Sequence, residues 1–242
     1  MASKLVEYTE ADYKVVTLKE WLSFMRGEWY QGEHIAFLGP TGTGKTTLAR
    51  ALVQLRTYVV AIATKRNDDT LESFKKERFT IIKKWPPHQW EKRVILWIKP
   101  TSLGKKDILS QREIISEALS DIYLAGGWCV FLDEAGYLST TLGQGMSIGM
   151  LMSQARSAGL SIVCGVQRPH SIAGQIPLEI LNQAKHHIFF KYEDRREIKS
   201  CAEIAGISYE FMIYLMSQLA IHEMRNTDFL YVGNGHIMLV KV

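Results

Sequence analysis

The sequence predicts an α/β fold with a largely parallel central sheet flanked by helices, and three observations support this. A complete G-x-x-x-x-G-K-[ST] phosphate-binding loop lies at residues 39–46, between an apolar run at 34–38 and a helix-like stretch at 46–53. Continuous apolar runs at 57–64 and 160–167 suit strands that are buried on both faces of a parallel sheet. A helical pattern at 108–124 leads into a further apolar run at 128–132.

Length and composition are consistent with one domain covering residues 1–242. The chain is 47% hydrophobic, which is ample for a core. Residues 1–32 form a lead-in, with a short strand near 13–17 and a helix at 18–26. Residues 33–206 form the central part. Residues 207–242 hold a helix at 209–219 and two apolar runs around Gly233-Asn234-Gly235, which predict a C-terminal β-hairpin that closes the sheet.

The distribution of apolar residues and cysteines indicates a cytoplasmic protein, in the host cytoplasm if the chain is viral. No apolar run approaches the roughly 18 residues that span a bilayer, and the N-terminus lacks the apolar segment of a signal peptide. Cys129, Cys164 and Cys201 are odd in number and widely spaced. Buried free thiols in a reducing compartment are therefore expected, and neither a metal site made by these cysteines nor membrane attachment is.

The phosphate-binding loop predicts a nucleotide site. Its glycines allow the backbone to wrap around phosphates, and the following helix N-terminus adds partial positive charge. Lys45 is expected to reach the β- and γ-phosphates, and the Thr46 hydroxyl to bind Mg²⁺. The alternative, a chance match in a glycine-containing loop, is disfavoured by the flanking strand and helix. The nucleotide-binding residues expected are Gly39, Pro40, Thr41, Gly42, Thr43, Gly44, Lys45, Thr46 and Thr47.

Polar residues end two of the apolar runs. The run at 128–132 is followed by Asp133-Glu134, the Walker B pattern, in which Asp133 holds the Mg²⁺ shell and Glu134 orients or deprotonates the attacking water. The run at 160–166 ends in Gln167, where a P-loop ATPase places a residue that senses the γ-phosphate. A strand followed by a polar turn, and an amide capping a strand end, are the structural alternatives. The acidic pair favours hydrolysis over mere binding.

Residues 65–106 form a basic segment. It holds twelve Lys and Arg against five Asp and Glu, a net charge of +7, while the whole chain carries +4. Aromatic residues are interleaved with these charges, namely Phe79, Trp85, Trp90 and Trp97. Two interpretations stay open: a surface that grips a nucleic-acid backbone, or an ordinary solvated face with its aromatics in the core.

Two further stretches complete the pattern. Residues 93–98 favour another strand. Gly, Ser and Thr are frequent from 140 to 149, which predicts a mobile loop, and a helix is expected at about 150–158.

The stretch 154–169, Gln-Ala-Arg-Ser-Ala-Gly-Leu-Ser-Ile-Val-Cys-Gly-Val-Gln-Arg-Pro, resembles the FtsK–HerA superfamily of DNA-pumping ATPases. With the two nucleotide motifs, the resemblance covers about residues 32–206. It implies a RecA-like (ASCE) P-loop NTPase fold and makes Arg156 the candidate arginine finger, which acts on a neighbouring subunit's γ-phosphate. Arg195 and Arg196 are rival candidates, and a helix-surface arginine is the structural alternative.

The resemblance implies an ATP- and Mg²⁺-dependent motor, a homo-oligomeric ring that translocates or packages double-stranded DNA without reading its sequence. The short chain looks like the compact genome-packaging ATPases of viruses and phages, for which a portal, capsid or accessory protein is a further expected partner. The alternatives are an assembly or secretion ATPase that acts on protein, as in filamentous-phage morphogenesis, a small-molecule kinase, and a nucleotide-gated binding module. No Asn-Lys-x-Asp guanine-reading motif is present, so ATP is preferred over GTP.

Overall fold

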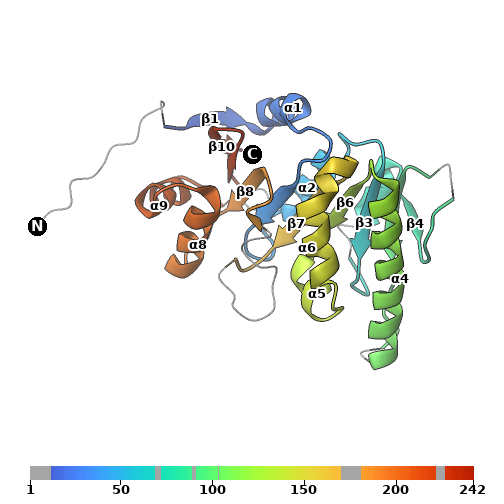
Figure 1. Ribbon diagram of the computed structural model, residues 1–242. Helices are drawn as coiled ribbons and strands as arrows, with labels where there is room; N and C mark the ends of the chain where they lie inside the picture. Colours follow the sequence, from blue (N-terminus) through green and yellow to red (C-terminus); the bar gives the residue numbers. More distant parts are fainter. Residues whose placement is uncertain (1–11, 69–71, 89–90, 103, 170–180, 222–226) are drawn as a thin grey trace, which may run out of the picture.

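The structure, a computed structural model, describes residues 12–68, 72–88, 91–102, 104–169, 181–221 and 227–242 (Figure 1). Within these residues, ten strands form one sheet in which only β9 runs antiparallel to the others. Across the sheet the order is β1-β10-β9-β8-β2-β7-β6-β3-β5-β4. The strands are β1 (Lys14–Thr17), β2 (Ile35–Leu38), β3 (Val59–Ala63), β4 (Thr80–Ile82), β5 (Arg93–Trp97), β6 (Cys129–Leu132), β7 (Ser161–Val166), β8 (His186–Phe190), β9 (Phe229–Gly233) and β10 (His236–Lys241).

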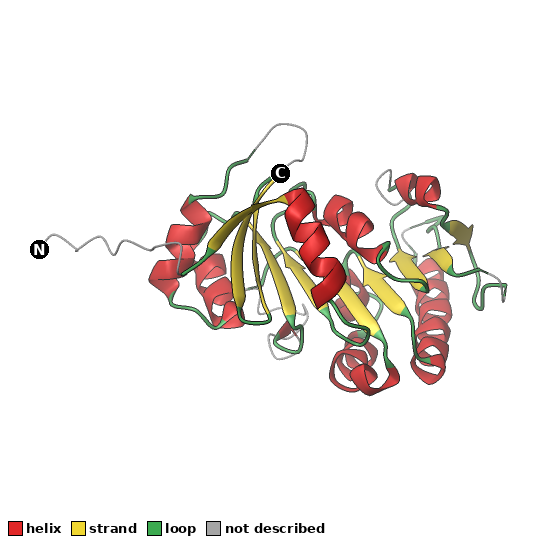
Figure 2. Cartoon of the chain, turned by 90° about the horizontal axis from the view of Figure 1, so that it is seen from above, coloured by secondary structure: helices red, strands yellow, loops and turns green. Residues whose placement is uncertain are grey.

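Helices cover both faces of the sheet, as Figure 2 shows. One face carries α1 (Leu18–Glu28), α2 (Lys45–Val53) and the 3₁₀ helix η1 (Ser73–Glu77). The opposite face carries α4 (Lys105–Ala125), α5 (Ala135–Thr140), α6 (Gly145–Gln154), α8 (Arg195–Ala205) and α9 (Tyr209–Ser217). A second 3₁₀ helix, η2 (Ala155–Ala158), follows α6. The predicted α/β fold with a mostly parallel sheet is therefore confirmed.

The central strands are apolar throughout because each of their faces packs against helices. In β2, Ala36 and Leu38 join the core under α4–α9, whereas Ile35 and Phe37 join the core under α1 and α2. All four residues are fully buried. Successive side chains of a strand point to opposite faces of the sheet, so one continuous apolar run supplies residues to both cores. Such a run therefore indicates a parallel sheet that is covered on both faces.

The C-terminal hairpin is confirmed. Strands β9 and β10 pair in antiparallel register around Asn234 and Gly235, whose positive φ angles of 50° and 74° are those of a tight Asn-Gly turn. The hairpin does not form the edge of the sheet, however. Strand β1 pairs with β10 on its outer side, so the predicted lead-in strand completes that edge.

The loop predicted for residues 140–149 is wrong. Helix α5 runs to Thr140 and α6 already begins at Gly145, so the helix expected at 150–158 starts earlier and ends in η2. Packing explains the difference. Leu142 and Ile148 are buried, and the buried Gln144 side chain donates to the Arg112 carbonyl and the Ser116 hydroxyl of α4. These contacts outweigh the weak helix propensity of Gly and Ser.

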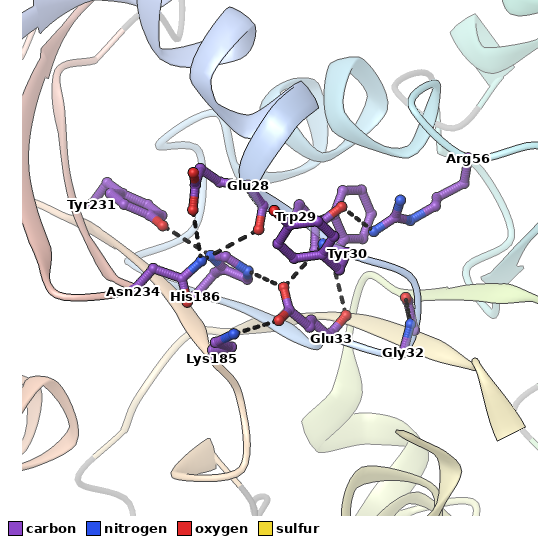
Figure 3. A network of polar contacts seen from close by, with 11 residues as sticks. Glu28, Trp29, Tyr30, Gly32, Glu33, Arg56, Lys185, His186, Tyr231 and Asn234 are labelled. Carbon is purple, nitrogen blue, oxygen red and sulfur yellow. Dashed lines mark hydrogen bonds and ion pairs between the residues drawn. The ribbon is translucent and has the colours of Figure 1, made fainter. Parts of the chain in front are cut away.

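A buried polar network joins α1, β2, β8 and β9 at the edge where β2 and β8 begin (Figure 3). The Glu33 carboxylate accepts from the Tyr30 N–H and pairs with Lys185 and His186. The other ring nitrogen of His186 lies 2.9 Å from the Tyr231 hydroxyl. Burial disfavours the charge of Glu33, but its hydrogen bonds with Lys185 and His186 outweigh that effect and lower its pKa. The network fixes the amino edge of the sheet, opposite the phosphate-binding loop.

None of the helices in the described part of the chain is long and apolar enough to cross a membrane.

Candidate nucleotide-binding site

The phosphate-binding loop connects β2 to α2 at the carboxyl edge of the sheet. The Gly39 N–H donates to the Val166 carbonyl, which fixes the start of the loop to β7. Gly42 and Gly44 have φ angles of 85° and 92°, in the left-handed region that glycine adopts at no steric cost. A Cβ on Gly39 would lie 2.7 Å from Cβ of Phe190. Both the conformation and the packing of this loop therefore require glycine.

Lys45 is the first residue of α2 and is almost completely buried. Its ammonium donates to the carbonyls of Gly39 and Pro40, both at 2.7 Å, so it lies across the loop. Burial lowers its pKa to about 8, and the neighbouring charge of Asp133 opposes that shift. No side chain caps the N-terminus of α2 at Gly44, so its first N–H groups suit an anion.

Asp133 and Glu134 follow β6 and face this loop. The Thr46 hydroxyl donates to Oδ1 of Asp133 at 2.5 Å. Burial raises the pKa of Asp133, and the hydrogen bond from Thr46 partly offsets the rise. Oxygen ligands of this kind, one hydroxyl and one carboxylate, are those that Mg²⁺ accepts beside phosphate oxygens. The two residues predicted to hold the metal are thus in contact and have suitable chemistry.

Gln167, at the end of β7, joins the loop to the acidic pair. Its Nε2 donates to Oε1 of Glu134 at 3.4 Å, and its Oε1 accepts from the Thr41 hydroxyl at 3.1 Å. Its backbone carbonyl accepts from the Tyr192 hydroxyl. Gln167 therefore contacts both the loop and the residue expected to activate water.

These residues enclose a pocket of about 210 Å³. It is lined by Thr41, Gly42, Gly44, Lys45, Thr46, Thr47, Lys65, Asp68, Asp133, Glu134 and Gln167. Three of the expected loop residues do not line it. Gly39 packs on Phe190, and the Thr43 hydroxyl donates to the Pro40 carbonyl, so Gly39, Pro40 and Thr43 shape the loop from outside the pocket.

Lys65 and Asp68 line the pocket although the motifs do not identify them. Lys65 follows β3, and its ammonium lies 3.0 Å from Glu134 and 3.7 Å from Asp133. By sequence, Lys65 belongs only to the basic segment at residues 65–106. A charged residue that follows a buried strand is expected at the carboxyl edge of the sheet. That expectation does not say which other residues it meets there. Lys65 reaches the acidic pair because β3 lies beside β6 in the sheet.

The three candidate fingers lie outside this pocket. Arg156 is exposed in η2, ahead of β7, and so lies at the amino edge of the sheet, where it lines an open hollow with Tyr123 and Ser153. Arg195 and Arg196 begin α8 after β8. Arg196 pairs with Asp194 at 3.1 Å, and both arginines are exposed.

The aromatics of the basic segment are mostly core residues. Phe79 and Trp97 are buried, and Trp85 is half-buried and donates to Asp121. Trp90 lies outside the described residues. The basic side chains are exposed at Lys75, Lys76, Arg78, Lys83, Lys84 and Lys92. The basic side chains of this segment therefore face solvent, whereas most of its described aromatic side chains pack in the core.

The strand, loop and helix that form the pocket, together with the sheet, define a P-loop NTPase fold. Neither a protein-family model nor a curated protein sequence matches the chain. Among solved structures, it is similar to B204, the DNA-packaging ATPase from Sulfolobus turreted icosahedral virus, with 15% identity, a TM-score of 0.55, and 87% of this chain and 97% of that chain covered. It is also similar to VirB4 of Thermoanaerobacter pseudethanolicus, with 10% identity, a TM-score of 0.65, and 86% and 88% covered. The genome-packaging NTPase B204 from Sulfolobus turreted icosahedral virus 2, solved with AMPPCP, matches at 14% identity and a TM-score of 0.53, with 86% and 97% covered.

Proposed function

We propose that this protein is an ATP-hydrolysing motor that works as a homo-oligomeric ring and translocates or packages double-stranded DNA. One observation carries the proposal: the phosphate-binding loop, the Thr46–Asp133 pair and the Glu134–Gln167 pair line one pocket. The similarity to two B204 proteins supports ATP as the nucleotide and DNA as the cargo, since one is described as a DNA-packaging ATPase and the other was solved with AMPPCP.

Each pocket residue has a role in hydrolysis that follows from its chemistry. The loop N–H groups and Lys45 bind the phosphates. Thr46 and Asp133 would hold Mg²⁺, which neutralises charge on the phosphate oxygens when bound. Glu134 orients a water molecule and accepts its proton, since a carboxylate beside the terminal phosphate is a competent base. Gln167 responds to the terminal phosphate, because its amide already joins Thr41 to Glu134.

The link from Gln167 to Tyr192 gives a route from the pocket toward α8. Tyr192 is buried and donates to the Gln167 carbonyl. Arg195 and Arg196 begin α8 three and four residues later. A shift of Gln167 on hydrolysis would therefore displace Tyr192 and, with it, the exposed basic N-terminus of α8.

Exposed charge supports DNA as the cargo. Lys75 and Lys76 lie in η1 and are exposed, within a segment whose net charge is +7. Such a surface binds phosphates without reading bases, which a motor that must move along any sequence requires. The basic segment is therefore the proposed DNA contact.

Exposed apolar residues support self-association. Met146 and Met150 are 81% and 47% exposed, and their spacing of four places them on one side of α6. Large exposed apolar side chains that cluster are typical of interfaces. Arg156 lies in η2, which directly follows α6, so a neighbour that covers the end of α6 would lie near the candidate finger.

The test is steady-state ATP hydrolysis with and without long double-stranded DNA at two salt concentrations. We expect DNA to stimulate hydrolysis, and the stimulation to fade as salt rises, because phosphate contacts release counterions. The double variant Lys75→Gln/Lys76→Gln should lose much of the stimulation. Lys14→Gln/Lys19→Gln, which removes two exposed charges outside the basic segment, should retain it.

Two outcomes would redirect the proposal. Robust hydrolysis that is indifferent to DNA would favour the assembly or secretion ATPase acting on protein. ATP binding without hydrolysis, with or without DNA, would favour a nucleotide-gated binding module.

A further inference from the structure

The backbone at Lys65 is held by hydrogen bonds, and its side chain is partly exposed. The indole N–H of Trp97, in β5, donates to the Lys65 carbonyl at 2.7 Å. The amide of Gln111, in α4, donates to the Thr64 carbonyl at 3.0 Å. Both donors are buried, whereas the Lys65 side chain is 43% exposed. Two elements therefore fix the point from which a flexible four-carbon side chain reaches into the pocket.

The Lys65 ammonium lies among three carboxylates. It is 3.0 Å from Glu134 and 3.7 Å from both Asp133 and Asp68. Burial alone would lower the pKa of Lys65, but the hydrogen bond to Glu134 and the neighbouring acids outweigh it and raise the pKa. Lys65 thus stays charged, and it offsets the repulsion that these acids would exert on a polyphosphate.

We propose that Lys65 is a specificity-determining residue that exchanges between Glu134 and the terminal phosphate of a bound nucleoside triphosphate. This inference rests on the proposed function, which places a nucleotide in the pocket. In the arrangement seen here the Lys65 ammonium lies 3.0 Å from Oε1 of Glu134, so it occupies an oxygen that would otherwise accept from water. A terminal phosphate offers more negative charge and more acceptor oxygens, so the ammonium moves to it and leaves Glu134 without its cationic partner.

The exchange accounts for two properties at once. A diphosphate lacks the group to which Lys65 would move, so Lys65 favours the triphosphate over the diphosphate. Glu134 becomes available for water only when a terminal phosphate is present. Lys45 is less suited to this role, because its ammonium is buried and held by the Gly39 and Pro40 carbonyls.

The test measures equilibrium binding of fluorescent ATP and ADP analogues in EDTA, so that neither metal nor turnover contributes. We expect Lys65→Met to weaken ATP binding on the order of tenfold and ADP binding much less, as for the loss of one charge-assisted contact. Arg66→Met is the matched control, since Arg66 is the next residue, is exposed and does not line the pocket. That control should change ATP and ADP binding alike and only slightly.

A double-mutant cycle tests the exchange itself. Glu134→Gln removes the carboxylate nearest to Lys65, so it should tighten ATP binding more in the wild-type background than in the Lys65→Met background. For ADP the two backgrounds should respond equally. Lys65→Arg, which keeps the charge, should retain most of the preference for ATP, and thermal melting of each variant checks that it is folded.

The outcomes separate this inference from the proposed function. Wild-type protein that binds ATP, combined with equal losses for ATP and ADP in Lys65→Met or no coupling with Glu134, would overturn the role of Lys65 alone. Wild-type protein that binds neither nucleotide would overturn both.

Discussion

In the proposed function, Glu134 is the residue that activates water for hydrolysis. Its carboxylate contacts both Gln167 and Lys65, and an amide in its place would keep the shape of the pocket. Glu134→Gln should therefore retain ATP binding and lower turnover on the order of 10²–10⁴-fold, the usual contribution of a general base. Binding and steady-state hydrolysis measured on the same preparation check this. Hydrolysis at the wild-type rate would remove Glu134 from the mechanism.

His34 is a buried neutral histidine that makes stability depend on pH. It is 3% exposed, and its Nδ1 accepts from the Ile162 N–H. Burial lowers its pKa from 6.5 to about 4. Between these values the unfolded chain binds a proton that the folded chain does not, so stability falls as pH falls, by about 3 kcal/mol for this group.

The variant His34→Asn should flatten that dependence. An asparagine oxygen can replace Nδ1 as an acceptor but does not titrate, so the variant should lose less stability than the wild type on acidification from pH 7 to pH 4. Urea unfolding at several pH values measures the slope. His88→Asn, at an exposed position, is the control and should leave the slope unchanged. An equal slope for His34→Asn and wild type would contradict the assignment.

Single residues differ in how far sequence alone could predict them. The conformation of residues 39–46 was predictable because the motif places glycine where the backbone needs left-handed φ angles. Gly42 and Gly44 do adopt such angles. Gln167 was predictable as the polar end of an apolar run. Lys65 was not, because its meeting with Glu134 depends on β3 lying beside β6, and no local pattern states which strands are neighbours.

At the scale of elements, the close approach of β6 and β7 positions the acidic pair. A Cβ on Gly165 would lie 2.6 Å from the Asp133 carbonyl oxygen. Gly165→Ala must therefore push the end of β6 away, and we expect it to destabilise the protein by about 1–3 kcal/mol and to weaken nucleotide binding. Gly27→Ala is the control, since a Cβ there meets nothing within 4 Å and alanine favours the helix.

Thermal melting and nucleotide titration of both glycine variants test this prediction. A Gly165→Ala protein as stable as the Gly27→Ala protein would show that the strands can separate at little cost.

The boundaries of helices could be predicted where the apolar periodicity was strong. They were missed where tertiary packing determined the start of the helix. The pattern at 108–124 predicted most of α4, which the structure extends to Lys105–Ala125. Helix α6 was missed at its start because residues 140–149 have a loop-like composition. The helix forms there because Gln144 and Ile148 are buried against neighbouring helices, and composition does not contain that information.

At the scale of the whole molecule, Arg156 and the pocket occupy opposite edges of the sheet. Strand β7, of six residues, separates them by about 20 Å, so the arginine does not serve its own pocket. If Arg156 acts on a neighbour, Arg156→Ala and Glu134→Gln subunits should each be inactive alone and should recover some hydrolysis when mixed. In the mixture, an intact Arg156 meets a neighbour's intact Glu134.

The mixing experiment needs proof that subunits exchange, for which a differently tagged partner and co-purification suffice. No recovery in rings shown to be mixed would exclude Arg156 and leave Arg195 and Arg196, which begin α8, as the remaining candidates.

The three cysteines have a practical consequence for experiments on the proposed ring. Cys129, Cys164 and Cys201 are all buried and free, and burial raises the pKa of each thiol, to about 12 for Cys129 and Cys164. Maleimide dyes react with exposed thiolates, so the natural chain offers them almost nothing at neutral pH. A single cysteine introduced on the surface would be the one labelled position. Subunit-to-subunit energy transfer could then be followed in single rings without first removing any native residue.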